Sequence, residues 1–140
     1  QVRDHLNRDR IDRAIALLAS AKRVDCFAVG YYGAVAQDAQ YKFLRLGVPS
    51  GTYTDPRVQA LAAQVLGRGD VAFIVSPSGR KDELLAVADA ARERGASVVA
   101  VTASAISRVP LTAAENAPSP SSRRRWIACA NSIPVAAVAC

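Results

Sequence analysis

Short apolar runs alternate along the chain with longer segments in which apolar residues recur at helical spacing. The runs are rich in β-branched residues, so they predict buried strands at residues 26–29, 71–75 and 97–102, with a further short strand around 51–54. The segments between them predict helices at residues 33–46, 56–66 and 82–94. Strands and helices should therefore alternate through most of the chain.

Capping residues indicate where several of these helices begin and end. Asp55 is a predicted N-cap with Pro56 at the first helical position, and Gly47 is expected to end the preceding helix. One more amphipathic helix should precede the first strand and end near Lys22 and Arg23, because cations suit the C-terminal end of a helix dipole.

This alternation predicts an α/β fold, a three-layer αβα sandwich built on a flavodoxin-like, doubly wound parallel sheet. In the strand order 2-1-3-4 the first and third strands are neighbours, and ligands bind where the winding direction reverses. The loops that follow these two strands, residues 30–33 and 76–79, should then lie together.

The loop Ser76-Pro77-Ser78-Gly79 is the sharper candidate for a binding site, because it joins a buried strand to a helix. Free N–H groups and the positive end of the helix dipole favour an anion there, and two hydroxyls can donate to it. A phosphate fits this chemistry. The loop Gly30-Tyr31-Tyr32-Gly33 is weaker alone, since a dinucleotide fingerprint would need a third glycine.

Composition is that of one globular domain, with 51% hydrophobic and 21% charged residues in 140. No apolar run is long enough to span a membrane and the charged N-terminus does not resemble a signal peptide, so we expect a cytoplasmic protein. The net charge of +6 is interleaved with acids over most of the chain and does not predict DNA contact. The three cysteines lack metal-ligand spacing, and Cys26 is expected to be a packed thiol.

The regular alternation ends after about residue 107. Residues 108–140 contain scattered prolines, a serine cluster and three consecutive arginines, and they show no clear fifth strand. The apolar run at 135–140 could be a strand or a helical turn. We therefore predict a domain at residues 1–107 with its N-terminal helix, followed by an atypical extension at 108–140.

Three segments, AVGYYGAVAQDAQYKFLRLG at 28–47, FIVSPSGRKDELL at 73–85 and SVVAVTAS at 97–104, resemble the SIS, or sugar isomerase, domain. The most similar members are the ligand-binding domains of RpiR-type regulators, HexR-like ones included. The resemblance covers residues 11–107 and implies the αβα fold, with hydroxyl-rich loops after the first and third strands that hold the phosphate of a sugar phosphate.

The resemblance also implies roles for individual residues. Ser76, Ser78 and Gly79 match the phosphate loop of the family, and Glu83 matches an acidic residue that often follows it. Lys81 stands where the family usually has a threonine, and it could reach the same phosphate as a cation. Tyr32 stands where the first loop usually has a serine. The expected ligand-binding set is completed by Gly30, Tyr31 and Gly33.

These observations favour a non-catalytic sensor that binds a sugar phosphate, with neither metal nor cofactor, and that forms a homodimer or a higher homo-oligomer. DNA would be bound only through a separate N-terminal helix-turn-helix domain, which this chain lacks. An aldose–ketose isomerase with Glu83 as its base is an alternative. A third reading is an assembly domain whose pocket Tyr32 and Lys81 have disabled. Glu83 also suits the first turn of a helix for dipole reasons alone.

Overall fold

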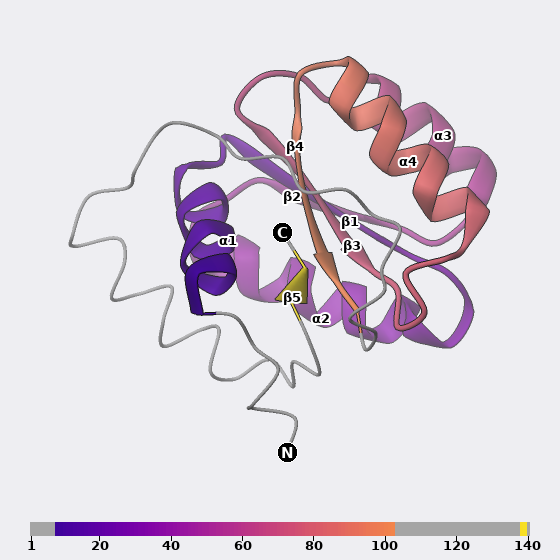
Figure 1. Ribbon diagram of the computed structural model, residues 1–140, viewed down its shortest axis with the longest axis horizontal. Coiled ribbons are helices and arrows are strands. Elements are labelled where there is room, and N and C mark those ends of the chain that lie inside the picture. Colours follow the sequence, from indigo (N-terminus) through magenta and orange to yellow (C-terminus); the bar gives the residue numbers. More distant parts are fainter. Residues whose placement is uncertain (1–7, 103–137, 140) are drawn as a thin grey trace.

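The chain folds around one five-stranded sheet with the strand order β2-β1-β3-β4-β5 (Figure 1). The computed structural model describes residues 8–102 and 138–139. The sheet comprises, in chain order, β1 (Arg23–Ala28), β2 (Ser50–Tyr53), β3 (Asp70–Val75), β4 (Ser97–Val101) and β5 (Val138–Ala139). The helices are α1 (Arg8–Ser20), the 3-10 turn η2 (Gly30–Tyr32), α2 (Gly33–Arg45), α3 (Pro56–Gln64) and α4 (Asp82–Glu93). The α/β fold class and the order 2-1-3-4 are thereby confirmed.

Two apolar cores lie on opposite faces of the sheet. Residues of α1 and α2 share one core with β1 and β3, where the rings of Phe43 and Phe73 meet edge to face at 5.4 Å. Residues of α3 and α4 share the other core, which contains Phe27 and Ile74. These two helices lie together on one side of the sheet (Figure 1). Neighbouring residues of β1 and β3 point to opposite cores, which explains why these strands read as continuous apolar runs.

The predicted caps are confirmed, whereas the predicted end of the first helix is wrong. The Asp55 carboxylate accepts a hydrogen bond from the Arg57 N–H at 2.8 Å, and Gly47 has a φ of +79° after α2. The helix α1 ends at Ser20, and Arg23 is the first residue of β1. Arg23 belongs to the strand because it pairs with Asp70 of β3 in the parallel ladder. Its side chain pairs with Asp25 on the same face, two residues along.

A fifth strand lies within the apolar run at 135–140, for which the sequence pattern left a strand and a helical turn open. Val138 and Ala139 pair antiparallel with Val101 and Ala100 of β4. Two residues are too few to show a period, and antiparallel pairing does not follow from the preceding alternation. Most of the predicted extension at 108–140 lies outside the described residues, so its proposed boundary stays a prediction. Among the residues described, no helix combines the length and the apolar character that crossing a membrane requires.

Cys26 is a packed thiol, as predicted, since its residue has no exposed surface. Burial raises its pKa to about 12, while a contact of 3.9 Å with the hydroxyl of Ser50 acts in the opposite direction. At neutral pH the nucleophilic thiolate form is therefore scarce in the folded protein.

We expect Cys26 to react with iodoacetamide at least tenfold more slowly in the folded chain than in urea, because both burial and the raised pKa suppress thiolate attack. Peptide mass spectrometry of a Cys129→Ser, Cys140→Ser double variant would isolate this thiol. Equal labelling rates with and without urea would contradict its burial.

Candidate functional site

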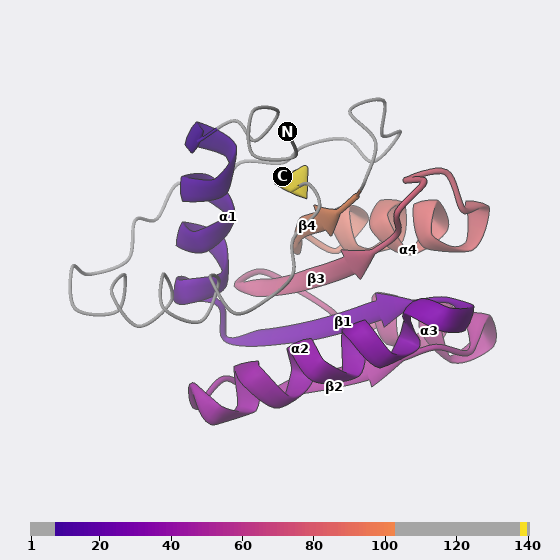
Figure 2. The ribbon, with the colours of Figure 1, turned by 90° about the horizontal axis from the view of Figure 1, so that it is seen from below.

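The two candidate loops leave the sheet from neighbouring strands. β1 and β3 pair in parallel over six residues, and the last pair joins Ala28 to Val75 (Figure 2). The loop at residues 76–79 therefore begins next to the end of β1, and the loop at residues 30–33 follows that strand. This arrangement is the one that the predicted topology required.

The loop after β3 is a tight turn fixed by its own backbone. The Gly79 N–H donates to the Ser76 carbonyl at 3.0 Å, and the Ser76 N–H donates to the Val101 carbonyl at 3.0 Å. Gly79 is buried with a φ of +61°, a conformation that favours glycine. The turn thus holds Ser76 against β4 and requires glycine three residues later.

The hydroxyls of this loop differ in their surroundings. Ser76 is 2% exposed, and its Oγ has no hydrogen-bond partner among the described residues. Ser78 is exposed, and its Oγ accepts a hydrogen bond from the Arg80 N–H at 3.3 Å. A hydroxyl that accepts can still donate its proton, so both serines retain a donor for a ligand.

The helix α4 begins directly after the loop without a side-chain cap. Lys81 occupies the N-cap position, and its side chain makes no capping hydrogen bond. It therefore does not accept from the N–H groups of the first turn of α4. Lys81 and Glu83 are both exposed, as is Arg80. Arg80 was not predicted as a site residue, although its position directly after Gly79 gives the loop a second cation.

The first loop is aromatic and close to the end of β2. The rings of Tyr31 and Tyr32 meet edge to face at 5.7 Å, and Tyr31 is 88% exposed. Gly30 has a φ of +60°. A Cβ on Gly33 would lie 2.9 Å from Thr54 Cγ2, so glycine there permits close packing of α2 against the end of β2.

Gln59 is a polar residue of this region that the sequence analysis missed. Its residue is fully buried, and its Nε2 donates to the carbonyls of Ala28 and Tyr53, both at 2.9 Å. These are the last residues of β1 and β2, so the side chain ties two strand ends together beside the first loop. The sequence did contain an indication that Gln59 is buried, because it lies at helical spacing from the apolar residues Ala62, Ala63 and Leu66.

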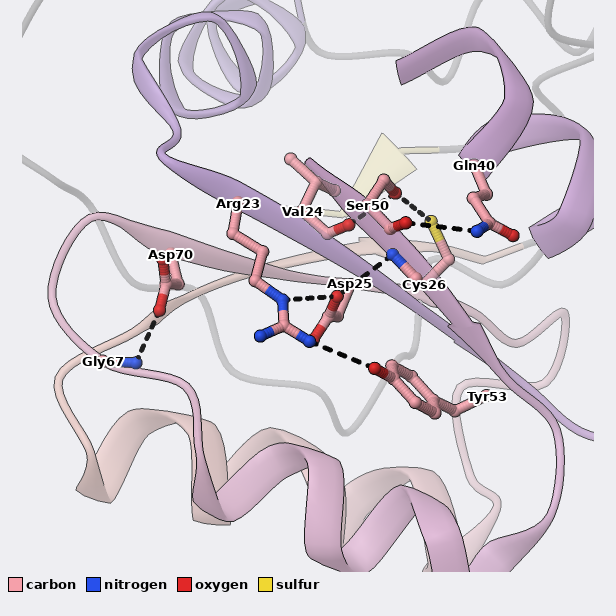
Figure 3. Close-up of polar contacts among 10 residues, drawn as sticks. Arg23, Val24, Asp25, Cys26, Gln40, Ser50, Tyr53, Gly67 and Asp70 are labelled. Atoms are coloured by element: carbon pink, nitrogen blue, oxygen red, sulfur yellow. Dashed lines mark hydrogen bonds and ion pairs between the residues drawn. The ribbon is translucent and has the colours of Figure 1, made fainter. Parts of the chain in front are cut away.

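A separate polar cluster lies at the amino end of β1, the opposite end from the loops (Figure 3). The fully buried Asp25 accepts from Arg23 Nε at 2.9 Å and from the Gly51 N–H at 3.1 Å. Arg23 also donates to the Tyr53 hydroxyl at 3.1 Å, and its hydrogen bond with Asp25 raises its pKa. The second Asp25 oxygen, Oδ2, has no hydrogen bond within the described residues but lies 2.9 Å from the Arg23 guanidinium in an ion pair. Because the buried carboxylate is held by neighbouring residues of the sheet, we interpret the cluster as structural.

The structure thus places Ser76, Gly79 and the first loop at the ends of neighbouring strands, with Lys81 and Glu83 in the start of α4. Within residues 8–102 and 138–139, no group of three or more potential metal ligands is gathered. The arrangement offers hydroxyl donors, cations and a helix N-terminus, which are the features that bind a phosphate.

Comparisons with known proteins point to one family. A family model described as the SIS domain matches residues 17–138. The bifunctional protein glk of Paraburkholderia xenovorans is 49% identical over 104 residues, which are 74% of this chain and 16% of that protein. The transcriptional regulator HexR of Pseudomonas aeruginosa is 42% identical over 93 residues, 66% of this chain and 33% of the regulator. This chain therefore spans only a small part of either relative.

A solved structure supports the fold over nearly the whole chain. The Vibrio vulnificus NanR protein, complexed with ManNAc-6P, aligns with a TM-score of 0.74 at 22% identity. The alignment covers 94% of this chain and 56% of NanR. At this identity the likeness establishes the shared architecture alone.

Proposed function

Because this chain belongs to the SIS domain family, we propose that it is a non-catalytic sensor domain that binds a sugar phosphate for an RpiR-type transcriptional regulator. The observation that carries the proposal is the hydroxyl of Ser76, which is buried without a partner at the end of β3. A buried polar group without a hydrogen bond is costly, and a bound ligand would remove that cost.

The phosphate would bind at the loop of Ser76, Ser78 and Gly79. Its oxygens would accept hydrogen bonds from the two serine hydroxyls and from N–H groups in the first turn of α4. Lys81 and Arg80 would add positive charge at the exposed rim. The sugar would then extend toward the first loop, where Gly30, Tyr31, Tyr32 and Gly33 lie, with Glu83 available to a hydroxyl.

Two relatives support a regulatory rather than a catalytic setting. HexR is a helix-turn-helix regulator, and the structure of NanR contains a phosphosugar. By analogy we propose that this domain acts in the cytoplasm as a homodimer or a larger homo-oligomer, and that DNA is bound by a separate domain. Ligand binding would change the geometry of the assembly and so the affinity for the operator.

An isomerase is the alternative that one feature favours. Glu83 is exposed in the first turn of α4, directly after the phosphate loop, where a base could reach a bound sugar. Isomerisation also needs a group that polarises the substrate carbonyl. Tyr32 and Lys81 stand where the resemblance to the family leads us to expect a serine and a threonine, so the pocket departs from the family pattern. We therefore retain the sensor as the main proposal.

The test is thermal unfolding of the chain with glucose 6-phosphate, fructose 6-phosphate, 2-keto-3-deoxy-6-phosphogluconate and N-acetylmannosamine 6-phosphate, against inorganic phosphate and free sugars. A ligand at a hundredfold excess over its Kd stabilises by about 2.7 kcal/mol, which raises Tm by several degrees. We expect one phosphosugar to produce this shift and Ser76→Ala to reduce its affinity at least tenfold.

Ser20→Ala is the matched control, because the Ser20 hydroxyl donates to the carbonyls of Ala16 and Leu17 in its own helix, at the end of α1. It should leave the ligand-induced shift unchanged. A cooperative unfolding transition that no phosphosugar moves would favour the disabled assembly domain. Conversion of an aldose phosphate to its ketose isomer would favour the isomerase.

A further inference from the structure

Gln59, like Ser76, is a buried polar residue with an unsatisfied atom at the carboxyl edge of the sheet. Its residue has no exposed surface, and Nε2 donates to the carbonyls of Ala28 and Tyr53, both at 2.9 Å. These bonds use both amide hydrogens and fix the orientation, because a flipped amide would turn Oε1 toward two carbonyl oxygens. Oε1 is buried and has no hydrogen-bond partner among the described residues. The amide therefore offers one acceptor and no spare donor.

Gln59 and Ser76 lie on the same side of the sheet. Ile74 belongs to the core that α3 and α4 cover, whereas Val75 belongs to the core that α1 and α2 cover. Alternation along the strand therefore directs Ser76 toward α3 and α4, and its N–H continues the ladder with a bond to β4 at 3.0 Å. Gln59 belongs to α3 itself and is buried against the strand ends of that same side.

The two unsatisfied atoms also belong to neighbouring strand ends. Gln59 bonds to the carbonyl of Ala28, and Ala28 is paired with Val75, the residue that precedes Ser76. Adjacent strands are about 4.8 Å apart, so the two backbone positions concerned lie about one strand spacing from each other. The hydroxyl of Ser76 can donate, whereas the amide oxygen can only accept. This edge thus presents a buried donor and a buried acceptor where the phosphate loop begins.

We propose that Gln59 Oε1 accepts a hydrogen bond from one hydroxyl of the bound sugar, and that this contact selects sugar phosphates that carry this hydroxyl. The inference rests on the proposed function and adds a requirement on the sugar. The dianion of a phosphate monoester only accepts hydrogen bonds, so it can satisfy Ser76 but not an amide oxygen. A sugar hydroxyl supplies the missing donor. A buried acceptor left without its donor is costly, so a site of this kind rejects a ligand that lacks the hydroxyl.

Gln40 shows what a fully bonded glutamine looks like in the same sheet. Its Nε2 donates to the Ser50 carbonyl at 3.1 Å (Figure 3), and its Oε1 accepts from the Thr52 hydroxyl at 2.6 Å. Gln40 thus also ties a helix to β2, but it lies on α2, on the other side of the sheet, and both of its polar atoms have partners. The unsatisfied oxygen is what distinguishes Gln59, and Gln40→Met is the matched control.

The test is isothermal titration of the chain with glucose 6-phosphate and its monodeoxy derivatives, and with the same series for any other phosphosugar that raises Tm. In the unaltered chain we expect the loss of one particular hydroxyl to weaken binding by about tenfold or more. In Gln59→Met the parent sugar and that deoxy derivative should bind equally. Gln40→Met should keep the difference between them.

A second measurement uses the unaltered chain, because Gln59→Met also removes the two bonds to the strand ends. Carbon-13 NMR of labelled glutamine side chains follows the Cδ of Gln59 during the titration. A hydrogen bond to Oε1 moves this resonance to a higher chemical shift. We expect the parent phosphosugar to produce the change, the discriminated deoxy derivative to produce none, and the Cδ of Gln40 to stay in place.

Two outcomes would overturn this inference and leave the proposed function intact. One is a phosphosugar whose preference over each deoxy derivative is the same in Gln59→Met as in the unaltered chain, which would make the amide a purely structural tie or the acceptor of a buried water only. The other is a Gln59 Cδ resonance that a bound phosphosugar does not move. If no phosphosugar binds the unaltered chain, the proposed function fails, and this inference fails with it.

Discussion

Replacing Arg23 by methionine is expected to lower the free energy of unfolding by about 3 kcal/mol. Asp25 has no exposed surface, and Arg23 supplies it with a hydrogen bond at 2.9 Å and an ion pair at 2.9 Å. Methionine keeps a long unbranched side chain but leaves the buried carboxylate, among the described residues, with only the Gly51 N–H as a donor. The loss should lie at the lower end of the range for buried pairs, because the Arg23 side chain is 38% exposed.

Urea denaturation followed by circular dichroism measures this change. Asp38→Ala is the matched control, because Asp38 is 54% exposed and its ion pair with Lys42 lies on the surface of α2. Such helical surface pairs contribute about 0.3–0.5 kcal/mol. If both variants lost the same small amount, the burial of Asp25 would not govern its energetic role, and the cluster would be an ordinary surface pair.

The sequence predicted the parallel part of the fold because its signals are local and repeated. β3 and β4 contain continuous apolar runs, α3 begins at the cap Asp55, and α2 is followed by the stop Gly47. Right-handed crossovers then left few possible arrangements of the sheet. The strand order followed from these rules together with the resemblance to the SIS domain.

What the sequence did not predict depends on contacts between distant residues. The charges of Lys22 and Arg23 indicated a helix end, whereas Arg23 pairs with the distant Asp70 of β3 as the first residue of β1. The two residues of β5 pair with β4 across a long separation in sequence. A local pattern does not encode pairings of this kind.

The sequence predicted where the candidate site lies in the fold, but it did not predict the contacts that its residues make. Topology required the loops of Ser76 and Gly30 to follow neighbouring strands, and the structure pairs those strands to their last residues. Gln59 was overlooked because a polar residue in a helix is usually assigned to the solvent side, yet it lies on the buried side and ties Ala28 to Tyr53. The helical spacing of Gln59 predicts its burial, whereas its polar side chain alone predicts exposure.

Gly79→Ala is expected to reduce phosphosugar affinity at least tenfold while it lowers the free energy of unfolding by about 1–2 kcal/mol. Gly79 is buried with a φ of +61°, and its N–H closes the turn onto the Ser76 carbonyl at 3.0 Å. A Cβ in this conformation is strained, so the turn would open and move Ser76 and Ser78 away from the start of α4. Isothermal titration with the phosphosugar that stabilises the unaltered chain measures the change in affinity.

Gly47→Ala separates the binding effect from the cost of the backbone conformation. Gly47 has a φ of +79° and open space where a Cβ would be added, and it ends α2 away from the loop of Ser76. Alanine there should cost a similar 1–2 kcal/mol of stability, on the same order as at Gly79, without any change in affinity. If Gly79→Ala bound the ligand normally, the conformation of this turn would not matter for binding. If both variants lost affinity equally, reduced stability alone would explain the effect, and the turn at Ser76 would have no special role.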